Sequence, residues 1–163
     1  MNDVDRGAFR AIAAECPGFQ ARATARAITR YHNACFRPLG LTAEQFSLMV
    51  GIGAAEGATL VELALSAGVD TTTLSRNIQT LEKRSWVKAE GGRGRSGKRL
   101  SLTASGRHLL SEALPVWRHA QATLSQRLGD NQLQLLRRAM AELAVAVEPL
   151  APNTLEDAGQ PLP

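Results

Sequence analysis

The sequence has 163 residues, 44% of them hydrophobic and 4% aromatic, and its formal net charge is +4. This length suits a single domain, and the apolar runs are far shorter than the roughly 20 residues that a membrane-spanning helix needs. The polar N-terminus, which includes Asn2, Asp3 and Asp5, lacks the pattern of a secretory signal peptide. We therefore expect a soluble, cytoplasmic protein that does not bind membranes.

A first long helix is predicted from near Gly18 to Arg37. Arg22, Arg26, Arg30 and Arg37 recur at spacings of four, four and seven residues, which places them in a row along the helix. This row could be a solvated face, a contact for acidic groups of a second subunit, or the wall of an anion site. We favour the solvated face.

Two short helices are predicted in the middle of the chain. Thr59 and Glu62 have the spacing of a capping box, so a helix should begin there. Gly68 should end it, and Asp70 or Thr71 can cap the next helix. Two brief helices joined by a tight turn predict a helix-turn-helix, whose second helix can enter the major groove of DNA. The inward stripe of this second helix consists of Leu74, Ile78 and Leu81.

The remaining side chains of the second helix carry hydroxyl, amide and guanidinium groups. Small hydroxyl side chains allow a close approach to DNA, and Arg and Gln suit the edges of guanine and adenine. An ordinary solvated face would have a similar composition, so the helix alone does not decide between the two. The candidate base-reading residues are Thr71, Thr72, Thr73, Ser75, Arg76, Asn77 and Gln79.

The next segment predicts a β-hairpin with a basic tip. Trp86–Ala89 and Leu100–Leu102 have the pattern of strands, and Gly91–Gly97 has the pattern of a flexible turn. Between Gly68 and Arg99, eight Lys and Arg residues face three Asp and Glu, so this segment alone has a net charge of +5. Positive charge this localised is typical of a surface that contacts a polyanion. The candidate phosphate or minor-groove contacts are Arg93, Arg95 and Lys98.

Two late helices carry narrow apolar stripes, and Thr103 is the expected cap of the first. Such stripes are typical of helices that pack against one another. They could cover the core of a monomer, but the helix-turn-helix region already supplies its own core, and we favour a dimer interface. The stripes are Leu110, Leu114, Trp117, Leu124 and Leu128, then Leu133, Leu136, Met140, Leu143 and Val147.

In this order, the motifs resemble those of the MarR family of bacterial winged-helix transcriptional regulators, from about residue 19 to about residue 150. The residues that carry the resemblance are Gly40-Leu41-Thr42 with Gln45-Phe46, Val69-Asp70 with Thr72 to Arg76, Leu81 to Arg84 with Trp86-Val87, and Leu102-Thr103 with Gly106.

The resemblance implies a mainly α fold with a small β-hairpin wing. Residues 41–102 would form the winged helix-turn-helix, which binds DNA. Residues of about 18–40 and 103–150 would form the helical dimerisation region, and 151–163 a flexible tail.

The family's function is then the expectation for this chain. It implies a homodimer that binds a pseudo-palindromic operator in double-stranded DNA and represses transcription until a small molecule releases it. Family effector pockets lie between the dimerisation region and the winged module, so a small aromatic or carboxylate effector would meet Arg30, Tyr31, His32 and Trp117. No cofactor is expected. No metal site is expected either, because the chain has only three His and no Cys pair at ligand spacing.

Three alternatives remain. A thiol-based redox sensor would use Cys16, although a straight helix would hold Cys16 and Cys35 roughly 28 Å apart, too far for a disulfide, and we favour an inert thiol. An architectural protein would coat DNA without sequence preference. A nucleotide-binding enzyme is suggested by 92–98, which fits the first seven positions of a phosphate loop, but Arg99 breaks the pattern and a strand follows. We therefore expect no enzyme.

Overall fold

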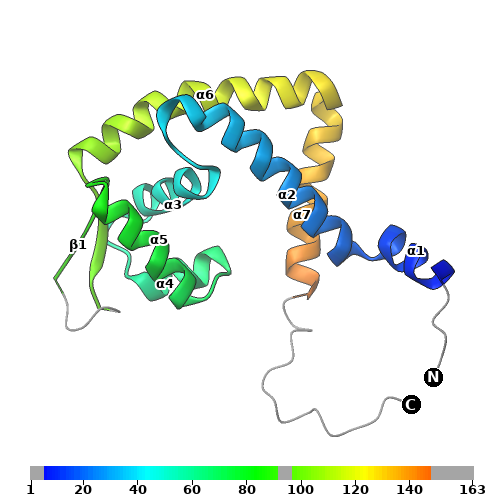
Figure 1. Cartoon of the computed structure of the whole chain (residues 1–163), viewed down its shortest axis with the longest axis horizontal. Coiled ribbons are helices and arrows are strands. Elements are labelled where there is room, and N and C mark those ends of the chain that lie inside the picture. The colour runs from blue at the N-terminus through cyan, green and yellow to red at the C-terminus, as the bar shows by residue number, and fades with distance from the viewer. Residues whose placement is uncertain (1–5, 92–96, 148–163) are drawn as a thin grey trace, which may run out of the picture. The chain divides into compact units, whose positions relative to one another are not determined.

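The computed structural model describes residues 6–91 and 97–147 (Figure 1). It divides into two units, Met1–Ala120 and Gln121–Pro163. The described residues are mainly helical and contain one antiparallel hairpin, so the predicted fold class is confirmed. None of the helices in these residues is both long and apolar enough to cross a bilayer. The elements are α1 (Arg6–Glu15), α2 (Pro17–Phe36), the 3-10 turn η1 (Arg37–Leu39), α3 (Ala43–Ala54), α4 (Leu60–Ala67), α5 (Thr71–Lys83), β1 (Val87–Glu90), β2 (Arg99–Leu102), α6 (Ala104–Leu128) and α7 (Asp130–Val147).

Short-range hydrogen bonds set the starts of the central helices. The amide of Glu62 donates to the hydroxyl of Thr59 at 3.3 Å, and the amide of Thr59 donates to the Glu62 carboxylate at 2.7 Å. This confirms the predicted capping box at the start of α4. Gly68, at a φ of 63°, then ends α4, and Asp70 caps α5.

The predicted hairpin is confirmed, with a shift of one residue in its first strand. Val87 pairs with Leu102 and Glu90 with Arg99. Trp86 does not belong to β1 because its amide donates to the carbonyl of Leu81 at 3.0 Å, which closes the end of α5.

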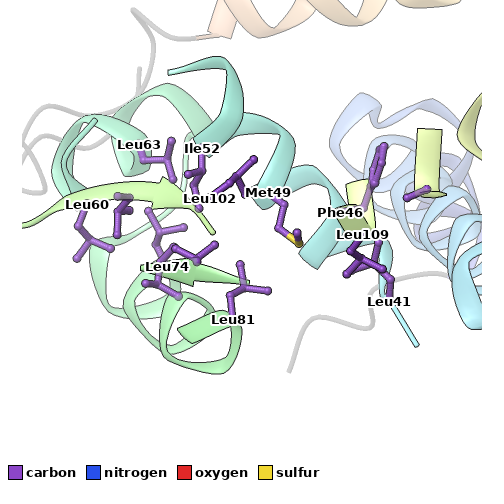
Figure 2. Close-up of a cluster of buried hydrophobic side chains, with 14 of the residues drawn as sticks. Leu41, Phe46, Met49, Ile52, Leu60, Leu63, Leu74, Leu81, Leu102 and Leu109 are labelled. Atoms are coloured by element: carbon purple, nitrogen blue, oxygen red, sulfur yellow. The ribbon is translucent and has the colours of Figure 1, made fainter. Parts of the chain in front are cut away.

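The core of the first unit lies where α3, α4, α5, the hairpin and α6 meet (Figure 2). Leu74, Ile78 and Leu81 are all buried, so the inward stripe predicted for α5 is confirmed. At the other end of the cluster, the rings of Phe36 and Phe46 stack with their centroids 4.6 Å apart, which joins α2 to α3. The side of α5 that carries Leu74, Ile78 and Leu81 packs against the core, and the opposite side of the helix is exposed.

The late helices differ from one another in burial. In α6, Leu109 and Ala113 belong to the core of the first unit, whereas Leu114 and Trp117 of the predicted stripe are exposed. In α7 none of the described residues is buried. The exposed large apolar residues of α7 are Leu135, Leu136, Met140, Leu143, Val145 and Val147.

The sequence interpretation did not include a helix before Gly18. The structure places α1 there, with Phe9 and Ile12 both 57% exposed. Cys16 lies between α1 and α2 as the N-cap residue of α2.

Gly106 allows the first turn of α6 to approach the end of α5 closely. A Cβ atom at this position would lie 2.0 Å from the carbonyl oxygen of Trp86, and this oxygen belongs to the backbone, so it cannot swing away. We expect Gly106→Ala to lower the free energy of unfolding by about 1 to 3 kcal/mol, the usual cost of overpacking. Chemical denaturation followed by circular dichroism measures the change.

Gly51→Ala is the matched control. A Cβ atom at Gly51, inside α3, would make only an ordinary 3.8 Å contact with Leu63. Because glycine is unfavourable inside a helix, this substitution should raise the free energy of unfolding by about 0.5 to 1 kcal/mol. Equal effects of the two substitutions would contradict the contact assigned to Gly106.

Candidate nucleic-acid interface

The exposed side of α5 shares an open groove with the start of α4. The groove has a volume of about 560 Å³. Thr71, Thr72 and Arg76 are exposed in it, and Ser75 and Gln79 are half-buried. Leu60 and Val61 of α4 complete its lining. The structure therefore brings five of the predicted base-reading residues together on one surface.

Thr73 and Asn77 belong to a different surface. Both line a second groove of about 720 Å³, whose walls come from α2, α3, α4 and α5. Thr73 is exposed and Asn77 is half-buried there. The structure thus divides the predicted base-reading residues between two grooves on either side of α5.

Asp70 holds the N-terminus of α5. Its carboxylate accepts a hydrogen bond from the amide of Thr73 at 2.8 Å. Hydrogen bonds from the side chain and then the amide of Thr73 lower the pKa of Asp70 below its ordinary value of 3.8. The carboxylate therefore stays ionised at neutral pH and interacts favourably with the positive end of the helix dipole. This cap presents the first turn of α5 in a defined orientation.

The basic residues of the hairpin differ in their contacts. Lys98 is exposed and lines a small crevice of about 90 Å³ between the hairpin and α5, where Ser75, Gln79 and Glu82 also lie. Lys98 therefore flanks the surface formed by α5. Arg93 and Arg95 lie outside the described residues.

Two other cations of the hairpin have partners within the chain. Lys88 pairs with Glu90 at 2.8 Å. Arg99 donates to the carbonyl of Gly57 at 2.8 Å, which ties β2 to the turn before α4. Hydrogen bonds from Thr59 lower the pKa of Glu62, and the charge of Arg99 adds a smaller effect in the same direction. Arg99 therefore has a structural role at the base of the hairpin.

The junction between α5 and the hairpin is held by contacts that the sequence analysis missed. Ser85 has a φ of 57°, and its carbonyl accepts hydrogen bonds from the hydroxyls of Thr103 and Ser105, each at 2.6 Å. Arg84 donates to the carbonyl of Gly40 at 3.0 Å, and its guanidinium lies 4.8 Å from the centre of the Trp86 ring. In the sequence, only the closeness of Arg84 to Trp86 could have suggested one of these contacts, the one between the guanidinium and the indole ring. Nothing in the sequence marks Ser85.

The four residues predicted to bind an effector do not gather in one place. His32 lines the second groove, and its Nε2 atom is buried without a hydrogen-bond partner among the described residues. Burial lowers the pKa of His32 below its ordinary value of 6.5. The hydroxyl of Tyr31 instead donates to the carbonyl of Ala120 on α6 at 3.1 Å. Arg30 and Trp117 are exposed and are not among the residues lining this groove.

Among the described residues the two cysteines are unpaired and no cluster of metal ligands is found. Cys16 and Cys35 are free thiols, both half-buried, and α2 separates them along almost its whole length. No group of three His, Cys, Asp or Glu side chains within 6–91 and 97–147 could hold a metal ion.

Comparisons with known proteins identify the family. A sequence model of the MarR family matches residues 39–96. Two crystal structures of the transcriptional regulator MosR from M. tuberculosis, one in complex with DNA, are each 36% identical to the chain. Each covers 84% of it, and the chain covers 98% and 99% of theirs, with TM-scores of 0.74 and 0.75. The chain belongs to the MarR family.

More distant structures share the fold of this MarR-family chain. A mutant of MarR from E. coli, complexed with operator DNA, is 23% identical and has a TM-score of 0.72. It covers 81% of the chain, and the chain covers 96% of it. None of the curated proteins compared with the chain matches it. The structural similarity to MosR and to MarR confirms the winged-helix fold predicted from the sequence.

Proposed function

We propose that this protein is a sequence-specific transcriptional repressor that binds a pseudo-palindromic operator through α5 and the hairpin. The observation that carries the proposal is the exposed groove lined by Thr72, Ser75, Arg76 and Gln79, which lies beside Lys98. Donors and hydroxyls at the start of a recognition helix are suited to base edges. MosR, the relative with 36% identity, has been crystallised in complex with DNA, which supports the same partner here.

Substitution of Arg76 and of Arg95 should have different effects on DNA binding. Arg76→Ala removes an expected base-edge contact, so it should cost ~1 to 3 kcal/mol and relax sequence preference at one position. Arg95→Ala removes an expected phosphate contact, so it should weaken binding to all sequences and reduce the salt dependence. Fluorescence anisotropy at several salt concentrations, with duplexes selected from a random library, measures both effects.

Arg127→Ala is the charge-matched control, because Arg127 lies in the last turn of α6 and is not among the residues that line the α5 groove. Its affinity should stay close to that of the wild type. Wild-type affinity in both the Arg76 and Arg95 variants would contradict the assigned contacts. Equal affinity of the wild type for selected and scrambled duplexes would instead favour an architectural protein.

We further propose a homodimer, in which α7 packs against a second copy. An 18-residue helix without a buried residue exposes Leu136 (39%), Met140 (46%) and Leu143 (40%) on one stripe. Contiguous exposed apolar surface of this kind marks interfaces. A dimer would also present two recognition helices to two half-sites of one operator.

A charge placed in this stripe should disrupt the dimer. We expect Leu143→Glu to shift the protein towards the monomer in analytical ultracentrifugation, because the interface would have to bury the new carboxylate. Val145→Glu is the control: Val145 is 69% exposed and, at two and a half turns from Leu136, it lies on the opposite side of α7. A monomeric wild type would contradict the proposed dimer.

We propose the second groove as the site of a small aromatic or carboxylate effector. Its walls join α2 to α5, so an occupant would contact Thr73 and Asn77 on the recognition helix itself. The unpartnered Nε2 of His32 offers a polar contact for such a molecule. Of the four residues predicted for this role, His32 alone is among those that line the groove.

Benzoate provides a direct test of this groove. It should weaken DNA binding by the wild type and not by Ser47→Trp, because Ser47 lies on the groove wall and the indole ring would fill the space. The variant should still bind the selected duplex, because Ser47 is not part of the α5 surface. Equal responses of wild type and variant to benzoate and its hydroxylated derivatives would contradict this location.

We propose no enzymatic activity. Lys98, the last residue of the segment that resembles a phosphate loop, is followed by strand β2, whereas a phosphate loop needs a helix N-terminus at that point. The remaining alternative, a redox sensor based on Cys16, would predict loss of DNA binding after peroxide treatment and its persistence in Cys16→Ser.

A further inference from the structure

We propose that Val61, on the first helix of the helix-turn-helix, selects thymine at one operator position by packing against its C5-methyl group. The inference rests on the proposed DNA-binding function. It adds a specificity residue that lies outside the recognition helix.

The position of Val61 separates it from the core of α4. Leu60, Leu63 and Ala64 are buried at 8%, 3% and 3% exposure, whereas Val61 remains 39% exposed. Its side chain lines the same open groove as Thr72 and Arg76 of α5. Val61 therefore belongs to the surface proposed to face DNA and not to the hydrophobic core.

The chemistry of this groove favours an apolar contact at one point. Its other exposed side chains, Thr71, Thr72 and Arg76, carry polar groups. The apolar feature of base edges in the major groove is the thymine methyl group, which aliphatic side chains contact. Burying Val61 against such a methyl group would remove apolar surface of both partners from water, a favourable change.

The neighbouring residues allow this contact to form. Thr71 and Thr72 at the start of α5 line this groove, and their small side chains would let the helix approach the duplex closely. In a helix-turn-helix, the N-terminal part of the recognition helix contacts the bases while the first helix crosses the backbone beside it. Val61 is the second residue of α4 and shares a groove with that part of α5. The thymine it reads should therefore flank the base pair that Arg76 contacts.

Replacing thymine by deoxyuridine tests the contact, because this change removes the methyl group and keeps every hydrogen-bonding group. Duplexes are first selected from a random library with the wild-type protein, and each thymine is then replaced singly. At one position in each half-site, the wild type should lose about fourfold in affinity, the equivalent of burying one methylene-sized group. Val61→Ala should show no loss at that position and normal losses elsewhere.

Leu65→Ala is the matched control. Leu65 lies one turn further along α4, is 78% exposed and is not among the residues lining the groove. This variant should respond to deoxyuridine like the wild type. Circular dichroism and thermal unfolding verify that both variants are folded.

Each outcome is decisive. Loss of the deoxyuridine response at one position in Val61→Ala alone supports the inference. A wild type without any deoxyuridine response, or a Val61→Ala response equal to that of the wild type, overturns it while sequence-specific binding stands. A wild type that selects no duplex overturns the proposed function, and this inference with it.

Discussion

The carbonyl oxygen of Ser85 accepts hydrogen bonds from two hydroxyls, and the relation between α5 and the hairpin depends on this junction. Thr103 and Ser105 supply the hydroxyls from the start of α6, and Gly106 lets the same turn of α6 approach the Trp86 carbonyl. The end of α5, the start of β1 and the start of α6 are therefore joined at this one junction. A protein that contacts DNA through both a helix and a wing needs their separation held in this way, because their contacts must fit one duplex at the same time.

The surface formed by α5 combines a rigid support with exposed polar groups. Asp70 sets the start of the helix, and the buried Leu74, Ile78 and Leu81 anchor its inner side. Arg99 ties β2 to the turn before α4, which leaves Lys98 beside the recognition helix. Charge in this region thus serves two purposes. Arg99 stabilises the base of the hairpin, and Lys98 is the cation that we propose contacts the phosphate backbone.

Much of this arrangement could be predicted from the sequence, because it depends on local hydrogen bonds and on periodicity. The capping box at Thr59, the cap at Asp70 and the stripe on α5 all rest on residues three or four positions apart. The division of Thr73 and Asn77 from Thr72 and Arg76 could not be predicted, since it depends on which neighbours surround α5. For the same reason Tyr31 and His32, adjacent in sequence, contact different surroundings.

The recognition helix has one side in each groove, and this has a thermodynamic consequence. Any molecule bound in the groove lined by Thr73, Asn77 and His32 would contact α5, the helix that we propose binds DNA. Reciprocity then requires that a compound lowering the affinity for the operator by a given factor be bound more weakly, by that same factor, when the operator is occupied. The concentration of compound needed for induction would therefore rise with the affinity of the protein for each operator. Genes whose operators bind the protein weakly would respond first.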